Sequence, residues 1–492
     1  MTRGNRQWLG PEFVAAAVVV LLTALRLYLA SKTGLSHDEA YYTFWSKSLS
    51  AGYFDHPPMV ALLIAPSRAI FGDNELGARF LAVMCLVLTS AAVWRIADLL
   101  LDRSTAALAV VLYNLAPAQI GFVVTPDAPS VLFWVGGLWA AAEFMRSRRA
   151  GWWLVAGLSA GLGLWSKYTD ALLPLGLLLF LLANSERRRW LTLWQVWAGA
   201  ALGVIVFLPV IVWNWQHDWA SFRFQGGRLS ADAIDPAFLW HFVELFGGFV
   251  VTLGPVVAVA AFVGLTACLI FPGDGFWRRV TMPVWTSLPL LGYFVLHSLH
   301  GGVQPNWPLP VSTALVVIAA WALIGLWRRI AWLAGLLIAL QVLIGITAIT
   351  ILSVQLLWQP FDLGGNDRSN EMRDWRGLVS EIDAVARDND AKWIATSHDY
   401  ALTGELASYA LFLGSSLPVR QIDEPERWVF LPALPAEIAS APAIFVSGRA
   451  DVPTQFASAQ LIKTVQRSDV RRAFATYWLF LVSVAAGGPT AN

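Results

Sequence analysis

The chain has 492 residues, of which 57% are hydrophobic and only 14% are charged, and its formal net charge is +1. Soluble chains carry about 25% charged residues, so this composition excludes an ordinary soluble protein. The small net charge also excludes a nucleic-acid binder that depends on bulk positive charge. We therefore expect a polytopic helical membrane protein, because apolar runs of about 20 residues can cross a hydrocarbon core of about 30 Å.

Apolar runs recur along the chain and predict about eleven membrane-spanning helices. The expected spans cover residues 12–30, 79–100, 104–121, 128–145, 152–166, 169–184, 193–213, 240–271, 281–298, 308–327 and 330–355. The run at 240–271 is longer than one span requires and has room for a second pass. Arg3 and Arg6 precede the first run without a small-residue cleavage site, which favours a retained helix over a signal peptide.

Basic residues alternate with these runs and predict the orientation of the chain. They cluster at Arg3 and Arg6, at 146–149, at 187–189, at 278–279 and at 328–329. Cytoplasmic loops carry an excess of Lys and Arg, so we expect these clusters inside. The other loops hold the acidic, histidine, lysine and aromatic motifs and are expected on the outer face. Apart from Arg95 and Glu143, near inner helix ends, little charge is expected at mid-span.

The first outward loop, residues 31–78, is the candidate active site. Charged groups this close to a bilayer are costly unless they face water or a protein cavity. Asp38 and Glu39 lie on an expected interfacial helix at 38–48, where neighbours point about 100° apart, so one can act as a base while the other positions the helix. Ser36 and Glu39 also fit a capping box, and a solvated loop is the alternative for the whole segment.

Later outward motifs supply further charged groups. Asp127 lies between two prolines at a span end, where it is either a second carboxylate for the reaction or ordinary helix-start chemistry. Lys167, followed by Tyr168, is either a phosphate ligand or a lysine that reaches the interface. Arg228 is likewise either a phosphate ligand or a basic residue that reaches the interface.

The sequence gives little support for a metal site. His37 and His56 lie among acidic residues, and binding of a divalent cation by these side chains is the alternative to contact with the substrate. No H-x-x-H or E-x-x-H pairing accompanies them. Cys85 and Cys268 lie in apolar runs and indicate neither a disulfide framework nor a thiolate site. We expect no metal and name no cofactor.

The composition changes after about residue 356. Residues 357–492 are expected to form a small α/β domain on the outer face, following a transmembrane catalytic module at 1–356. Its expected helices are 371–387 and 402–413, and its expected strands are 392–396, 443–447 and 476–484.

The outward motifs follow a particular order. They are DEAYY at 38–42, GYFDHPP at 52–58, TPDAP at 125–129, SKY at 166–168, WN at 213–214 with HDWASF at 217–222, and PNWP at 305–308. In this order they resemble the bacterial branch of the protein mannosyltransferase-like GT-C glycosyltransferases, which includes the lipid A aminoarabinose transferase. The resemblance covers essentially the whole chain.

This resemblance implies roles for individual residues. It implies Asp38 as the general base and Asp127 as a supporting carboxylate, and Glu39 is grouped with them as catalytic. The donor phosphate is expected to meet His56, Lys167, Tyr168 and Arg228. His56 replaces a lysine of the aminoarabinose transferase, which would make this contact sensitive to pH near an ordinary pKa of about 6.5. The remaining substrate contacts are expected from Asp55, Tyr42, His37 and Trp307, and the sequence leaves open whether Asp38 or Asp55 is the base.

The implied activity is an inverting transfer of a sugar from a polyprenyl phosphate to a glycolipid or other envelope acceptor. It would occur at the outer face of a bacterial inner membrane, with no nucleic acid involved. Protein O-mannosylation is an alternative acceptor chemistry. A transporter of lipid-linked sugars is an alternative of another class, since Gly161 and Pro174 can mark the broken helices that transporters use.

Overall fold

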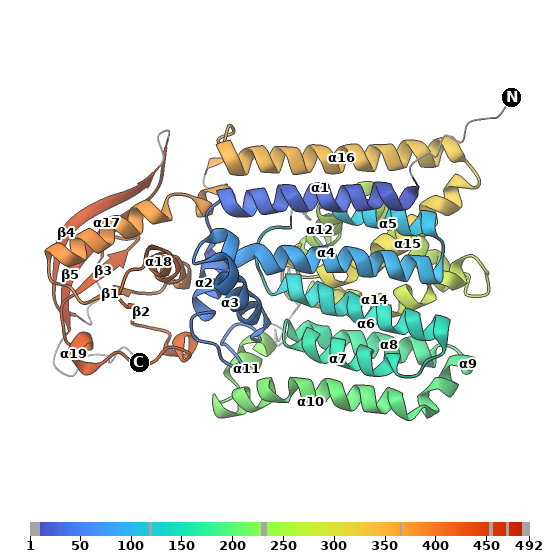
Figure 1. Ribbon diagram of the computed structural model, residues 1–492, viewed down its shortest axis with the longest axis horizontal. Helices are drawn as coiled ribbons and strands as arrows, with labels where there is room; N and C mark the ends of the chain where they lie inside the picture. The colour runs from blue at the N-terminus through green and yellow to red at the C-terminus, as the bar shows by residue number, and fades with distance from the viewer. Residues whose placement is uncertain are drawn as a thin grey trace. The chain divides into compact units, whose positions relative to one another are not determined.

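The computed structural model describes residues 10–117, 121–227, 234–364, 367–451, 456–468 and 472–484. The chain divides into two compact units, whose elements are labelled in Figure 1. The helical unit comprises Met1–Leu27, Ala82–Phe122 and Pro126–Ser353. The mixed unit comprises Tyr28–Leu81, Val123–Thr125 and Val354–Asn492, so it combines the expected first loop with the expected C-terminal domain.

The helical unit is built mainly from apolar helices. Three of them continue into the mixed unit: α1 (Pro11–Lys32), α4 (Glu75–Leu100) and α16 (Ala331–Trp358). The others are α5 (Arg103–Asn114), α6 (Asp127–Ser147), α7 (Trp152–Leu164), η1 (Tyr168–Ala171), α8 (Leu172–Leu182), α9 (Ser185–Arg188), η2 (Arg189–Thr192), α10 (Trp194–Gln216), α11 (Ala220–Gly227), α12 (Phe238–Leu253), α13 (Pro255–Ile270), η3 (Trp277–Val280), α14 (Thr281–His297) and α15 (Leu309–Trp327). Large apolar side chains are exposed along α1, α10 and α16, which is typical of helices that contact lipid.

Each expected span contains a helix. Within the described residues, six helices are long and apolar enough to cross a membrane, and two bent helix pairs raise this number to eight. The expected span at 104–121 is helical only over Arg103–Asn114. The run at 240–271 forms two helices, in agreement with its excess length. A polytopic helical fold is therefore confirmed, and the count of eleven spans stays a prediction.

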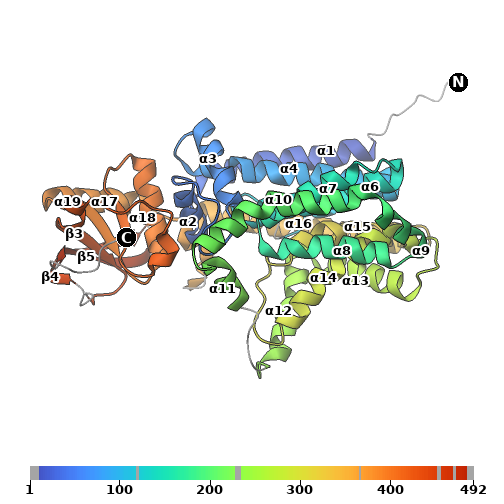
Figure 2. The same cartoon turned by 90° about the horizontal axis from the view of Figure 1, so that it is seen from below.

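Helices α7 and α10 run side by side in both views (Figures 1 and 2). Gly157 packs against the Gly199 carbonyl, and an added Cβ at Gly157 would overlap it. One turn later, a Cβ at Gly161 would lie 2.8 Å from the Gly203 carbonyl oxygen. Small residues four apart let two helix backbones approach closely in a membrane. Gly161 therefore lies inside a continuous helix and serves packing, rather than marking a broken one.

The helical unit also contains a sharp bend. Helices α12 and α13 meet at 115° across Gly254, whose φ of 85° favours glycine. Gln341 of α16 fills the break: its Nε2 donates to the Leu253 carbonyl at 3.0 Å, and the Val257 N–H donates to its Oε1 at 3.4 Å. The side chain thus satisfies backbone groups that the bend releases, as a nonpolar environment requires.

The mixed unit is an α/β assembly. Its first segment contributes α2 (His37–Trp45) and α3 (Met59–Phe71). Its last segment contributes η5 (Arg368–Met372), α17 (Trp375–Asp388), β1 (Trp393–Thr396), α18 (Tyr400–Leu413), β2 (Val419–Gln421), η6 (Pro425–Trp428), α19 (Ala436–Ala439), β3 (Ala443–Ser447), β4 (Phe456–Ser468) and β5 (Ala473–Val484). The predicted α/β character and the predicted helices and strands are confirmed, whereas α3, β2 and β4 were not predicted.

The five strands form one sheet with the order β2-β1-β3-β5-β4. Strand β1 pairs in parallel with β2 and β3, while β5 pairs antiparallel with β3 and β4. Trp393, Phe445 and Phe480 lie in its buried core. Helix α18 follows β1 and packs against α2, which brings the end of the chain to the first-loop residues.

Candidate active site

Helix α2 begins where its sequence predicts. Ser36 precedes it in extended conformation, and the Ser36 N–H donates to Glu39 Oε2 at 2.9 Å. This is the contact that a capping box assigns to the third helical residue. A helix thus forms at Asp38 as expected, although it ends at Trp45 rather than at residue 48, and Glu39 helps to fix its start.

Glu39 is fully buried against Arg79 of α4. The Arg79 guanidinium donates to Oε1 and Oε2 of Glu39, each at 2.7 Å, and the Val124 N–H donates to Oε1 at 2.8 Å. Arg79 also donates to the carbonyl oxygens of Ala30, Thr33 and Gly34. A buried bidentate pair with its hydrogen bonds satisfied suits a positioning residue, so this geometry does not favour the predicted catalytic role of Glu39.

Asp38, the neighbour of Glu39, is exposed and accepts a hydrogen bond from Tyr400 Oη at 3.0 Å. The surrounding protein nevertheless covers the other sides of the Asp38 carboxyl, and this partial burial raises its pKa. Asp55 and Glu39 raise this pKa further, whereas the Tyr400 hydrogen bond and Arg368 lower it. An accessible carboxylate with a raised pKa has the properties of a general base.

Asp55, the other carboxylate considered as a base, is paired. Arg427 Nη1 lies 2.6 Å from Oδ1 and 2.7 Å from Oδ2 of Asp55, and Tyr41 Oη donates to Oδ2 at 2.8 Å. The guanidinium carbon of Arg427 also lies 4.9 Å from the centre of the Tyr400 ring. Arg427 thus connects Asp55 to the tyrosine that contacts Asp38.

His37 contacts Glu405 rather than lying open to a substrate, with Nδ1 at 3.0 Å from Oε1. Burial, together with smaller effects of Arg467 and Arg368, lowers the pKa of His37 to about 4. Burial also raises the pKa of Glu405 well above its usual range. Burial thus disfavours the charged form of each partner in this contact.

Two other predicted residues of the loop lie side by side. The ring centres of Tyr42 and His56 are 6.1 Å apart, and Tyr42 is almost fully buried. Within the described residues, no group of three or more His, Cys, Asp or Glu side chains could hold a metal ion.

The helical unit contains a separate cluster of polar side chains around Asp127. Lys167 Nζ donates to Oδ1 of Asp127 at 2.6 Å, and Asn306 Nδ2 donates to Oδ2 at 2.9 Å. Both charged side chains are buried, which leaves Lys167 paired with a carboxylate. A donor phosphate at Lys167 would therefore have to share this cation with Asp127.

The remaining predictions fall on three residues. Tyr168 Oη lies 2.8 Å from Ser221 Oγ, and Asn214 Nδ2 donates to Tyr168 at 3.4 Å, so Tyr168 anchors α11 to α10. Trp307 lies 5.6 Å from His297 between ring centres. Arg228 lies outside the described residues. Tyr168 and Trp307 belong to the same unit as Asp127 and Lys167.

Charged side chains inside the expected spans have polar partners. Arg95 and Glu143 form an ion pair at 2.7 Å. Arg26, which is buried within α1, also donates to the Asn114 side chain at 3.0 Å. Its partner is polar but uncharged, and hydrophobicity alone gives no signal for such a pair.

Sequence reasoning missed Tyr400, Arg427 and Arg79. The first two come from the C-terminal part of the mixed unit, 362 and 372 residues from Asp38 and Asp55 respectively. No local motif indicates this pairing. Arg79 does carry a local signal, because a basic residue near the start of an apolar span needs a polar or acidic partner.

Comparisons with known proteins agree with this architecture. A family model described as dolichyl-phosphate-mannose-protein mannosyltransferase matches residues 55–213. The apo structure of ArnT from Cupriavidus metallidurans aligns over 96% of this chain and 99% of that chain, with a TM-score of 0.60 and 16% identity. The oligosaccharyltransferase AglB from Archaeoglobus fulgidus aligns over 81% of this chain and 64% of that chain, with a TM-score of 0.54 and 12% identity.

Curated sequences point the same way. A lipid A galacturonosyltransferase of Rhizobium johnstonii is 27% identical over 59% of this chain and 61% of its own length. These matches support a GT-C glycosyltransferase. An undecaprenyl phosphate-α-4-amino-4-deoxy-L-arabinose arabinosyl transferase of Pseudomonas aeruginosa is 28% identical over 56% of this chain and 51% of its own length. The chain thus matches about half to three fifths of the length of each of these relatives.

Proposed function

We propose that the chain is an inverting glycosyltransferase that moves a sugar from a polyprenyl-phosphate donor to a glycolipid of the lipid A or lipopolysaccharide type. The observation that carries the proposal is Asp38, an accessible carboxylate held by Tyr400 in a crowded, charged setting that raises its pKa. We place the enzyme in a bacterial inner membrane as a multi-pass protein, with the C-terminal α/β part on the periplasmic side.

In the proposed reaction, Asp38 accepts the proton of the acceptor hydroxyl as its oxygen attacks the anomeric carbon. The new carbon–oxygen bond forms on the face opposite the donor phosphate. The bond from the anomeric carbon to the phosphate oxygen breaks, and its electron pair leaves with the polyprenyl phosphate. One displacement inverts the configuration at the anomeric carbon.

The phosphate that leaves carries negative charge and needs a cation. Lys167 is the proposed partner, since its ammonium group is buried and positioned by Asp127, and Arg228 and His56 are proposed as further contacts. A structure of ArnT from Cupriavidus metallidurans is described as bound to undecaprenyl phosphate, which supports this donor class for a chain of the same fold.

Relatives named for lipid A and lipopolysaccharide chemistry favour a glycolipid acceptor over a protein. The description of the family model names protein mannosylation, so protein remains the second acceptor class to test. Pairing of Asp55 with Arg427 supports the assignment of the base to Asp38 and leaves Asp55 a role in holding the loop.

The proposal predicts that Asp38→Asn abolishes sugar transfer while the folded protein is retained. The test is mass spectrometry of lipid A, lipid-linked glycans and envelope proteins from cells with the wild-type chain, the variant or no chain. One sugar should disappear from one acceptor both in the deletion and with Asp38→Asn. Asp73→Asn is the matched control, since Asp73 belongs to a partly exposed pair with Arg68 and should preserve transfer.

Glu39→Gln separates positioning from catalysis in the same experiment. It leaves the buried Arg79 without its countercharge, so we expect less folded protein, at a cost of about 3–5 kcal/mol. Activity per folded molecule should remain measurable. Wild-type transfer by Asp38→Asn would refute the assigned base, and redistribution of a lipid-linked sugar without any change of mass would favour a transporter.

A further inference from the structure

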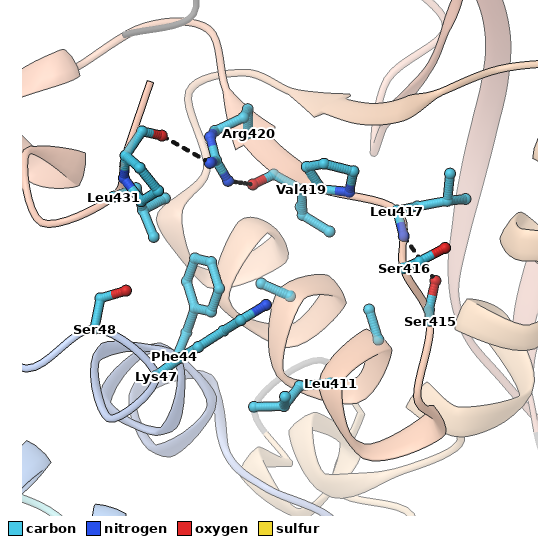
Figure 3. Close-up of a pocket in the computed structure, with 14 residues that line it drawn as sticks. Phe44, Lys47, Ser48, Leu411, Ser415, Ser416, Leu417, Val419, Arg420 and Leu431 are labelled. Atoms are coloured by element: carbon cyan, nitrogen blue, oxygen red, sulfur yellow. Dashed lines mark hydrogen bonds between the residues drawn. The ribbon is translucent and has the colours of Figure 1, made fainter. Parts of the chain in front are cut away.

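A polar cavity lies within the mixed unit and is not used by the proposed reaction. Its volume is about 280 Å³, and it lies between the end of α2, helix α18 and the segment that leads into β2 (Figure 3). Phe44 and Leu411 supply apolar walls, while Lys47 and Arg420 supply two cations. None of the fourteen described residues that line it is acidic.

Arg420 is the unusual member of this lining, because it is only 7% exposed. Its Nη1 and Nη2 donate to the carbonyl oxygens of Val419 and Pro432, each at 3.0 Å. Its Nε is buried and has no hydrogen-bond partner in the described part of the chain. Burial lowers the pKa of Arg420, and no carboxylate contributes an opposing effect. Neutral carbonyl groups therefore hold a buried charge that lacks a countercharge, which is costly.

A purely structural role accounts for only part of this arrangement. A clamp between β2 and the segment at 432 explains the two Nη contacts but supplies no countercharge for the guanidinium group. Lys47 follows the C-terminal end of α2, where a cation favours the helix dipole, and its side chain reaches in among the lining residues (Figure 3). The nearby acid Asp383 accepts from Ser415 Oγ at 3.1 Å but does not line the cavity.

We propose that this cavity binds an anion of the phosphate class, either a phosphomonoester or a diphosphate. Arg420 and Lys47 would supply the positive charge, and the hydroxyl groups of Ser48 and Ser416 would donate to the remaining oxygens. The volume suits a phosphate group with little attached to it, since pockets for larger ligands start at about 300 Å³. The proposal does not depend on the transferase reaction, because none of its residues acts there.

Calorimetry with pyrophosphate tests the site on the full-length chain in nanodiscs of phosphatidylcholine. We expect saturable binding that weakens by about tenfold in Lys47→Gln, which removes one charge-assisted contact. Lys392→Gln is the matched control, an exposed lysine of the same unit that does not line the cavity, and should bind as the wild type does. Arg420→Gln should weaken binding further. Because Lys47 is exposed, its variant should fold, so the test remains valid even where Arg420→Gln fails to fold.

Lys167→Gln distinguishes this cavity from the proposed donor site, because the cavity predicts that its binding component persists in that variant. A second set of nanodiscs, with phosphatidic acid added, identifies the source of the phosphate. Competition between phosphatidic acid and added pyrophosphate, lost in Lys47→Gln, would support a lipid headgroup, whereas pyrophosphate binding without competition would support a soluble phosphate. Absence of saturable binding, or equal affinity in Lys47→Gln and the wild type, would overturn the proposal.

Discussion

Asp38 and Asp55 are carboxylates of one loop in contrasting surroundings. Arg427 holds both oxygens of Asp55 in an ion pair, whereas Asp38 accepts a hydrogen bond from the neutral hydroxyl of Tyr400. A carboxylate that must accept a proton needs to be reachable and not already neutralised by a cation. The choice of base, which the sequence leaves open, is therefore argued from the partners of these two residues.

Tyr400→Phe tests whether this hydrogen bond tunes Asp38. The base is active when ionised, so activity should fall as the pH is lowered through the pKa of Asp38, which is raised above 3.8. The hydrogen bond lowers that pKa, so its removal should move the acid limb of kcat/KM to higher pH. At neutral pH we expect a loss of about two- to tenfold.

The measurement is a profile of kcat/KM against pH for both proteins. Tyr28→Phe is the control, an exposed tyrosine of the same unit, and should leave the limb in place. A loss of activity in Tyr400→Phe with an unmoved limb would assign Tyr400 a structural role only.

At the scale of elements, the bend between α12 and α13 depends on a side chain from a third helix. Gln341→Leu removes the donor to the Leu253 carbonyl and leaves that oxygen buried without it. We expect a loss of about 1–3 kcal/mol in unfolding free energy. Thermal unfolding of the purified chain measures it, and Leu336→Ala on the exposed face of α16 is the control, with an effect near zero. Equal stability of both variants would mean that the bend needs no such support.

Most elements follow from hydrophobicity and period, and the exceptions have physical reasons. The apolar runs place α1, α10 and α16 to within a few residues, because a membrane helix must satisfy its backbone internally and stay apolar outside. Strand β4 was missed because it is a mostly exposed edge strand with little apolar alternation. Strand β2 is only three residues long and depends on its pairing with β1.

At the scale of the whole molecule, the candidate site shows what a local motif can and cannot predict. Asp38 is a candidate from the sequence because charged residues beside an apolar run are unusual. The partners that decide its chemistry, Tyr400 and Arg427, come from a distant segment of ordinary composition, so only the tertiary fold brings them to the loop. Lys167 is predicted from the sequence as a phosphate ligand or as a lysine that reaches the interface, and its pairing with Asp127 is likewise invisible to spacing.

A double-mutant cycle on Asp55 and Arg427 measures how strongly the two ends of the mixed unit are coupled. Asp55→Asn and Arg427→Gln should each destabilise the unit, because each removes one ion-pair partner of a largely buried charge. The double variant should be more stable than the sum of the two losses predicts, with an interaction energy of about 1–3 kcal/mol. Protection of α2 from hydrogen exchange reports it, and strictly additive losses would contradict the coupling.

The mixed unit joins residues 28–81 to residues from 354 onward, and this order has a consequence during synthesis. Arg427 follows Asp55 by 372 residues, which a ribosome at about 5–20 residues per second adds in about 20–75 s. For that interval water takes the place of Tyr400 and Arg427 beside the loop carboxylates. The protein therefore gains its complete candidate site only when its last segment is synthesised, so a chain that stops before residue 400 would lack the partners of Asp38 and Asp55.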